Sequence, residues 1–110
     1  MRSDEQRLRD VLAAVEAIHA HLERGTLHDG LVFDAVRVRL IEIGEAVKAI
    51  DPAVFVAEPL VPWADIAGMR NHLAHRYFDT DHAIVSATVE SDLPPLAAAV
   101  HRLLGNRDRL

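Results

Sequence analysis

The chain has 110 residues, half of them apolar, and carries a formal net charge of −5 with no cysteine. This length supports one domain, residues 1–110, and the lack of thiols excludes a disulfide framework and any thiolate metal site. The acidic balance argues against a protein that coats nucleic acid with a broad basic surface. Contact with RNA would therefore need a small local site or a partner.

The first residues are charged from Arg2 onward, and no apolar run approaches the roughly 18 residues of a membrane-spanning helix. We therefore expect neither a signal peptide nor a membrane span, and a cytoplasmic location. Aromatic residues are few, so the core must consist mainly of Leu, Ile, Val and Ala, a composition that suits helices.

The first predicted helix covers roughly residues 4–24. Ser3 and Gln6 are spaced as an N-cap residue and its reciprocal partner, and Gly25 is a plausible stop. Between them, apolar residues recur at helical spacing: Leu8, Val11, Leu12, Val15, Ile18 and Leu22.

After a turn over residues 25–30, a second helix is predicted from about 31 to 50. Its polar residues Asp34, Arg37, Glu45 and Lys48 form a stripe interrupted by Ile41. Its apolar residues spread widely, which requires more than one packing partner: Val32, Val36, Leu40, Ile43, Val47 and Ile50, with Val38 and Ile41 at the margin. This helix is either the centre of the core or packs partly against a second subunit. Close approach of another helix would explain Gly44 within it.

Residues 51–62 contain three prolines and are predicted to be a connection. Pro62 can begin a third helix, because the first turn needs no amide donor from it, and this helix should end near residues 75–77. A turn at residues 79–81 and a short helix over about 81–90 should follow.

Ser91 and Asp92 are predicted to cap a last helix whose first turn contains Pro94 and Pro95. No pattern of paired strands is present. The sequence as a whole predicts an all-α fold, an antiparallel bundle of four to five helices.

The chain has seven histidines. Five are best explained as structural or solvated: His19, His21, His28, His82 and His101. His72 and His75 lie three residues apart and could face one metal ion, but a pair alone is a weak signal. A helical metal-binding protein therefore stays open only as a minor alternative.

A second set of residues, Arg70, Asn71, His75 and Tyr77, suits phosphodiester cleavage. Histidine can move the proton of a ribose 2′-OH or of a leaving group, and arginine can stabilise a phosphate as charge develops. Asn71 and His75 would share a helix face. Arg70 and His75 would lie about 140° apart on an ideal helix, so the helix must end between them, Arg70 must curl round, or the site must close across a dimer axis. On composition alone these could still be polar groups at a helix end.

The segment Arg70-Asn71-His72-Leu73-Ala74-His75 resembles the R-x4-6-H signature of HEPN domains, and with Tyr77 it resembles the HepT ribonuclease toxins. The resemblance extends over essentially the whole chain. Further matching segments are Ile43-Gly44-Glu45-Ala46, Pro62-Trp63-Ala64-Asp65-Ile66 and Asp92-Leu93-Pro94.

This resemblance implies the toxin of a toxin–antitoxin pair: a homodimeric, metal-independent endoribonuclease without a cofactor, in which two motifs line one cleft. Arg70 and His75 would be catalytic, Asn71 would support them, and attack by the 2′-OH would leave a 2′,3′-cyclic phosphate. An MNT-type nucleotidyltransferase antitoxin would silence the toxin by transferring AMP to Tyr77. The roles of His72 and Arg76 stay open. The chief alternative is a non-catalytic HEPN subunit that binds a nucleotidyltransferase.

Overall fold

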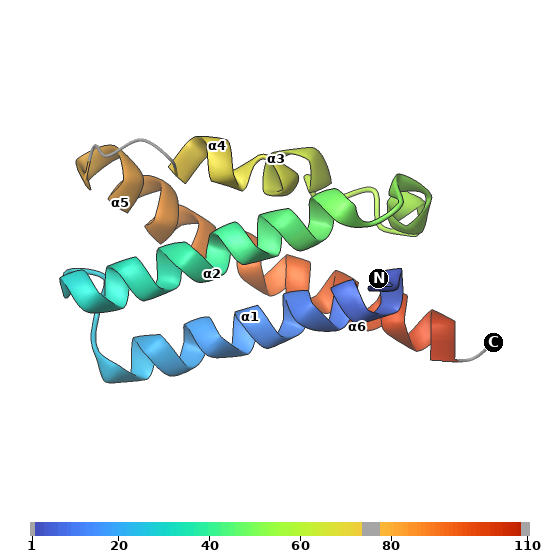
Figure 1. Ribbon diagram of the computed structural model, residues 1–110, viewed down its shortest axis with the longest axis horizontal. Helices are drawn as coiled ribbons and strands as arrows, with labels where there is room; N and C mark the ends of the chain where they lie inside the picture. Colours follow the sequence, from blue (N-terminus) through green and yellow to red (C-terminus); the bar gives the residue numbers. More distant parts are fainter. Residues whose placement is uncertain (1, 74–77, 109–110) are drawn as a thin grey trace.

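The chain folds into a bundle of helices, as a computed structural model shows for residues 2–73 and 78–108, with side chains described except at 78–80 and 107–108. The α-helices are α1 (Asp4–Arg24), α2 (Gly30–Ala49), α3 (Trp63–Ala67), α4 (Met69–Leu73), α5 (Phe78–Ala87) and α6 (Leu93–Asp108). A 3₁₀-helix, η1 (Pro52–Ala57), and a π-helical turn, η2 (Thr88–Asp92), complete the described part, which contains no strand. The predicted all-α bundle is confirmed. In Figure 1, α1 and α2 run side by side in opposite directions.

The first two helices begin and end close to the predicted residues. The amide of Ser3 donates to the Gln6 side chain at 2.8 Å, and the Gln6 amide donates to the Ser3 hydroxyl at 3.1 Å, which is the predicted capping box. Gly25 ends α1, as predicted. The cap of α2 was not predicted: the Asp29 carboxylate accepts from the amides of Leu31 and Val32.

Helix α2 is the centre of the bundle and packs against α1, α3, α4 and α5. The apolar residues predicted for its core face are all buried. Gly44 allows α3 and α4 to approach, since a Cβ atom there would lie 2.7 Å from the Ile66 carbonyl oxygen and 3.0 Å from the Met69 Cβ. The predicted explanation of Gly44 is confirmed.

The third predicted helix is not continuous. It is divided at Gly68 into α3 and α4, so the prediction of one continuous helix from Pro62 was wrong. Its predicted end near residues 75–77 lies outside the described residues. Gly68 has φ −85° and ψ 7°, which turns the chain, and the Asn71 amide donates to the Gly68 carbonyl at 3.0 Å. Glycine destabilises a helix interior, so interrupting the helix at Gly68 lowers the stability of the fold only slightly.

Two further predictions need correction. Residues 79–81 are not a turn, because α5 already begins at Phe78. Ser91 and Asp92 do not cap a separate helix, because η2 joins α5 to α6 without a break. The ring of Pro94 would clash with the carbonyl four residues earlier in a regular helix, and the wider π turn relieves that clash.

Side-chain contacts attach the connection between α2 and α3 to Trp63 of α3 and to Arg102 of α6. Phe55 and Trp63 stack with ring centroids 3.9 Å apart, and the Trp63 indole donates to the Glu58 carbonyl at 2.8 Å. Arg102 of α6 donates to the Glu58 carboxylate, and these hydrogen bonds lower the pKa of Glu58. Among the described helices, none is both long and apolar enough to cross a membrane.

Candidate functional site

Arg70 and Asn71 lie side by side on α4, and both are exposed. They line a polar hollow of about 310 Å³ between α2 and the α3–α4 pair. Its other lining residues are Glu45, Lys48, Ala67 and Gly68. The structure therefore brings together two of the predicted site residues with two charged residues of α2.

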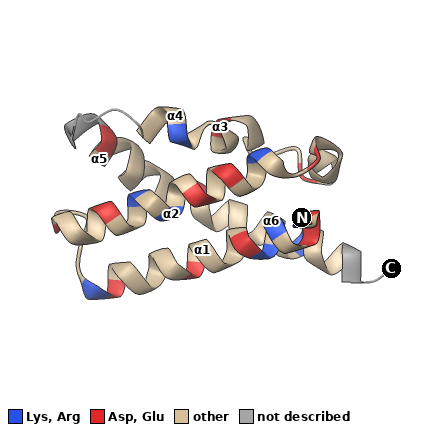
Figure 2. Cartoon of the chain, viewed as in Figure 1, with Lys and Arg blue, Asp and Glu red and all other residues tan. Residues whose placement is uncertain are grey.

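The guanidinium of Arg70 lies 3.8 Å from a carboxylate oxygen of Glu45. The Arg70 side chain is 71% exposed and that of Glu45 46% exposed, so water screens this pair. In Figure 2, the basic stretch of α4 lies next to acidic stretches of α2. Arg70 is thus held only loosely and is accessible to an anion arriving from solvent.

The predicted site residues His75 and Tyr77, and the neighbouring Arg76, lie outside the described residues. Their roles, the pairing of Asn71 with His75 and the angle of about 140° between Arg70 and His75 stay predictions. His72 is described and exposed. Its Nε2 would lie 3.8 Å from a Cβ at Gly68, and His72 is not among the residues that line the polar hollow.

Arg37 of α2 makes a contact that the sequence did not reveal. Its guanidinium donates a hydrogen bond to the carbonyl oxygen of Leu73, the last residue of α4. Its Nε atom lies 4.0 Å from a carboxylate oxygen of Asp81 in α5. Asp81 is buried, with its side chain 6% exposed.

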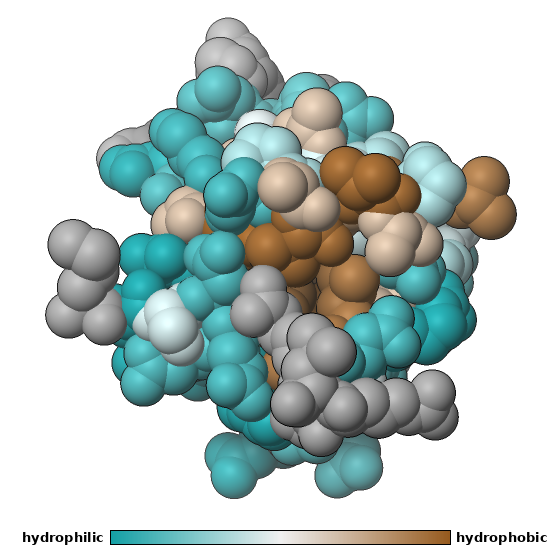
Figure 3. All heavy atoms as spheres, turned by 90° about the vertical axis from the view of Figure 1, so that its right-hand side faces the viewer, coloured by the Kyte–Doolittle hydropathy of each residue, from teal (hydrophilic) through white to brown (hydrophobic). Residues whose placement is uncertain are grey.

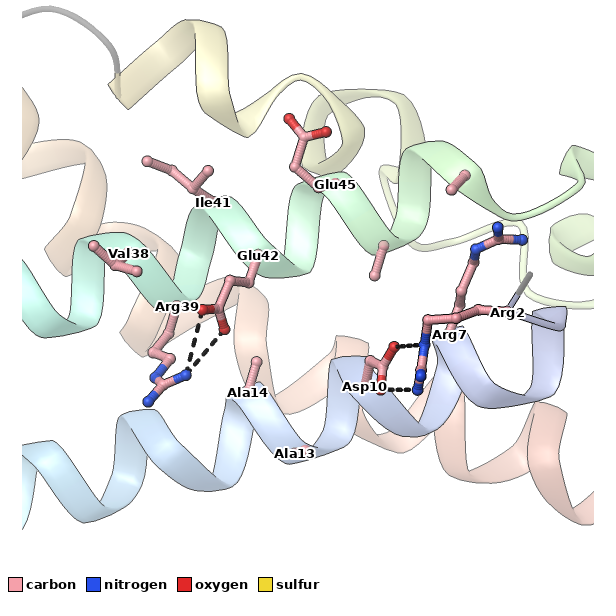
Figure 4. Close-up of a pocket in the computed structure, with 12 residues that line it drawn as sticks. Arg2, Arg7, Asp10, Ala13, Ala14, Val38, Arg39, Ile41, Glu42 and Glu45 are labelled. Atoms are coloured by element: carbon pink, nitrogen blue, oxygen red, sulfur yellow. Dashed lines mark hydrogen bonds and ion pairs between the residues drawn. The ribbon is translucent and has the colours of Figure 1, made fainter.

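An apolar groove between α1 and α2, of about 660 Å³, forms a second surface beside the polar hollow. Figure 4 shows Val38 and Ile41 on α2 and Ala13 on α1, with ion pairs joining Arg39 to Glu42 and Arg2 to Asp10. Val38 is 49% exposed and adds apolar surface to this groove. Glu45 lines both the groove and the polar hollow, so the two surfaces are continuous.

Apolar residues also gather around a hollow at the end of the bundle where η1 lies (Figure 3). This hollow, of about 460 Å³, includes Ile50, Phe55, Val56 and Trp63 in its lining. Among the described residues that line it, Lys48 is the only charged one. It offers mainly apolar contact area.

The five histidines assigned structural or solvated roles fit that assignment. His19 and His101 are exposed. His21 accepts a hydrogen bond from Arg39 at 3.3 Å, and the rings of His28 and His82 stack 5.1 Å apart. Within residues 2–73 and 81–106, no three His, Asp or Glu side chains are placed to hold one metal ion.

Comparison with known proteins identifies the family. The chain matches the family described as "Ribonuclease HepT-like" over residues 8–103. It belongs to the HepT-like ribonuclease family. Membership of this family confirms the resemblance on which the sequence-based interpretation rests.

Individual HepT-like relatives match over different shares of the chain. The chain is 32% identical to "Probable ribonuclease HepT" of Thermococcus cleftensis over 106 residues, which cover 93% of this chain and 96% of that protein. It is 40% identical to "Putative RNase TTE0752" of Caldanaerobacter subterraneus subsp. tengcongensis over 68 residues, 61% of each chain. No solved structure matches the chain significantly.

The sequence of this HepT-like chain did not indicate that three charged residues of α2 lie at or beside the candidate site: Arg37, Glu45 and Lys48. The signal available was the polar stripe on an otherwise apolar second helix. That stripe is where α2 meets α4, since Glu45 approaches Arg70 and Arg37 bonds to Leu73. Sequence periodicity identified the stripe but not what lies against it.

Proposed function

We propose that this protein is a metal-independent endoribonuclease that acts in the cytoplasm as the toxin of a toxin–antitoxin pair. The observation that carries this proposal is the exposure of Arg70 and Asn71 together in a polar hollow of a HepT-like ribonuclease family member. An arginine in such a place can bind a phosphate with its planar, bidentate fork.

The proposed chemistry is a transesterification. His75 accepts the proton of the ribose 2′-OH, whose oxygen attacks the adjacent phosphorus. The bond from phosphorus to the 5′ oxygen breaks, and that oxygen takes a proton from solvent, to which His75 then returns the proton that it accepted. The products are a 2′,3′-cyclic phosphate and a 5′-hydroxyl end. Arg70 stabilises the charge on the non-bridging oxygens, and Asn71 supports these groups.

The charged residues of α2 would modulate substrate binding. Lys48 lines the same hollow as Arg70 and adds a second cation for an RNA backbone. Glu45 offsets part of this positive charge, since its carboxylate lies 3.8 Å from Arg70. A local site of this kind suits a protein whose net charge is −5.

We further propose that the active form is a homodimer built on the groove between α1 and α2. The groove has an apolar floor and a charged rim, the usual composition of a protein interface. Because Glu45 also lines the polar hollow, a second subunit in the groove would lie beside Arg70. This arrangement supports one cleft shared by two motifs.

The proposed partner is an MNT-type nucleotidyltransferase that transfers AMP to Tyr77. An added phosphate would repel an incoming RNA phosphate by roughly 4 kcal/mol if the two charges lay 4 Å apart at an effective dielectric near 20. The adenosine would also obstruct the site. The alternative is a non-catalytic subunit that binds such an enzyme, and the exposed, loosely held Arg70 favours the ribonuclease.

The deciding experiment compares purified wild type with Arg70→Ala, His75→Ala and, as the control, His101→Ala on the exposed side of α6. Wild type and control should cleave RNA to products with 2′,3′-cyclic phosphate ends. Both site variants should lose roughly 10²- to 10⁴-fold in rate while keeping the helical circular dichroism spectrum. A wild type that cleaves no RNA but binds a nucleotidyltransferase tightly would favour the alternative.

A further inference from the structure

Arg37 contacts one residue before and one residue after His75, the proposed catalytic histidine. Its guanidinium donates to the carbonyl of Leu73, where α4 ends, and its Nε atom lies 4.0 Å from Asp81 in the first turn of α5. His75 lies between Leu73 and Asp81 in the sequence. One side chain of the central helix therefore holds the residues that precede and follow His75.

The burial of these groups distinguishes this contact from an ordinary surface ion pair. The Arg37 side chain is 28% exposed and the Asp81 side chain 6% exposed. Water screens the attraction less in such surroundings than at a fully exposed site. One carboxylate oxygen of Asp81 is buried without a hydrogen-bond partner among the described residues, so removal of the Arg37 charge would leave a buried carboxylate uncompensated.

Other arginine ion pairs in the described part connect fewer of these elements. The pair of Arg70 with Glu45 joins α4 to α2, and both of those side chains are exposed. Arg39 pairs with Glu42 and Arg9 with Glu5, each within a single helix. Arg37 joins α2, α4 and α5.

We propose that Arg37 is a positioning residue for the reaction. It fixes the end of α4 relative to the start of α5, and so holds the segment that carries His75 in place relative to Arg70, three residues before Leu73. This inference rests on the proposed ribonuclease function. Arg37 acts through Leu73 and Asp81 and does not touch the RNA.

A positioning role predicts a different result from a purely structural one. Displacement of a catalytic group by about 1 Å can lower turnover by roughly 100-fold while substrate binding persists. Loss of Arg37 should therefore lower kcat far more than it changes KM. Lysine keeps the charge but not the planar fork that serves two partners, so Arg37→Lys should restore only part of the loss.

The test uses the full chain as wild type, Arg37→Gln, Arg37→Lys and, as the control, Asp34→Asn, which removes an exposed charge of the same helix that lines neither the groove nor the polar hollow. Amide hydrogen exchange, followed by mass spectrometry, is measured over peptides that contain residues 69–81. Cleavage of a short RNA then gives kcat and KM. We expect Arg37→Gln to raise exchange in these peptides by roughly tenfold or more and to lower kcat by roughly 10- to 100-fold, with KM within about threefold. Arg37→Lys should give intermediate values of exchange and kcat, and Asp34→Asn should match wild type.

Unchanged exchange in Arg37→Gln would overturn the inference, as would an unchanged kcat in an active enzyme or an equal loss in Asp34→Asn. If Arg37→Gln does not fold, Arg37→Lys decides by the same criteria. If wild type cleaves no RNA, the proposed function fails separately, and hydrogen exchange still decides whether Arg37 holds α4 to α5.

Discussion

The Arg70 guanidinium and the Glu45 carboxylate lie 3.8 Å apart, on α4 and α2, at the mouth of the polar hollow. Both side chains are largely in water, so the pair contributes little to folding. Its consequence is electrostatic: an RNA phosphate that approaches Arg70 must also approach a negative charge.

We predict that Glu45→Gln improves RNA binding. Two charges about 4 Å apart in water interact by roughly 1 kcal/mol, so KM should fall by up to about fivefold while kcat stays within about twofold. Steady-state kinetics on a short RNA measures both constants. Asp34→Asn, which removes an exposed carboxylate that lines neither the hollow nor the groove, is the control and should change neither constant. A higher KM in Glu45→Gln would show that Glu45 orients Arg70 for binding.

Gly44→Ala should destabilise the protein although alanine is the better helix former. The new Cβ would lie 2.7 Å from the backbone oxygen of Ile66, which cannot move without shifting α3. Overpacking of this kind costs roughly 1–3 kcal/mol, more than the roughly 1 kcal/mol gained in helix propensity. Urea denaturation measures the change. The matched control is Gly105→Ala in α6, where nothing lies within 4 Å of the new Cβ, and it should leave stability unchanged or raise it.

Val38→Glu should dissociate the proposed dimer. Val38 is 49% exposed and lines the groove between α1 and α2, so a charge there would be buried at the interface. Multi-angle light scattering at tens of micromolar should give the dimer mass for wild type and the monomer mass for the variant, if the interface has the usual size of about 1,600 Å². Leu31→Glu, on the same helix but outside the groove, should remain dimeric. A monomeric wild type would contradict the shared cleft.

The contact between Glu58 and Arg102 should stabilise the fold only above mildly acidic pH. Hydrogen bonds from Arg102 lower the pKa of Glu58 below its ordinary value of 4.5. A carboxylate whose pKa is lowered on folding adds stability above the unfolded value, and this stability is lost as pH falls through the lowered folded value. The difference in Tm between wild type and Glu58→Gln should therefore be present near neutral pH and shrink below pH 4.5. Arg102→Gln should flatten the same pH dependence, and a difference in Tm that grows toward acid would contradict this assignment.

Tyr77→Phe should keep most of the ribonuclease activity but escape silencing by the partner. The change removes the hydroxyl that would accept AMP and leaves the aromatic ring. Wild type and variant are incubated with the cognate nucleotidyltransferase and ATP, and the intact proteins are weighed. Wild type alone should gain the mass of one or more AMP groups. An equal gain on both proteins would place the modification on another residue.

The sequence by itself determined the helical elements that depend on local chemistry. The capping box of Ser3 and Gln6, the stop at Gly25 and the buried face of α2 were all predictable, because caps and helical periodicity depend on residues a few positions apart. Local chemistry also misled where it was ambiguous. Asp, Thr and Ser suit both turns and first helical turns, so the start of α5 and the continuous path through η2 were missed.

Only the tertiary structure decided what lies against the polar stripe of α2. That Arg37 bonds to Leu73 and that Glu45 approaches Arg70 depends on how α4 is placed over α2. This placement depends in turn on two glycines. The chain turns at Gly68 between α3 and α4. At Gly44 the absence of a side chain lets the backbone of α3 lie close to α2. Spacing along the chain cannot predict the contacts of Arg37 with Leu73 and of Glu45 with Arg70. The residues of each pair are 25 or more positions apart in the sequence and meet only because the helices pack together.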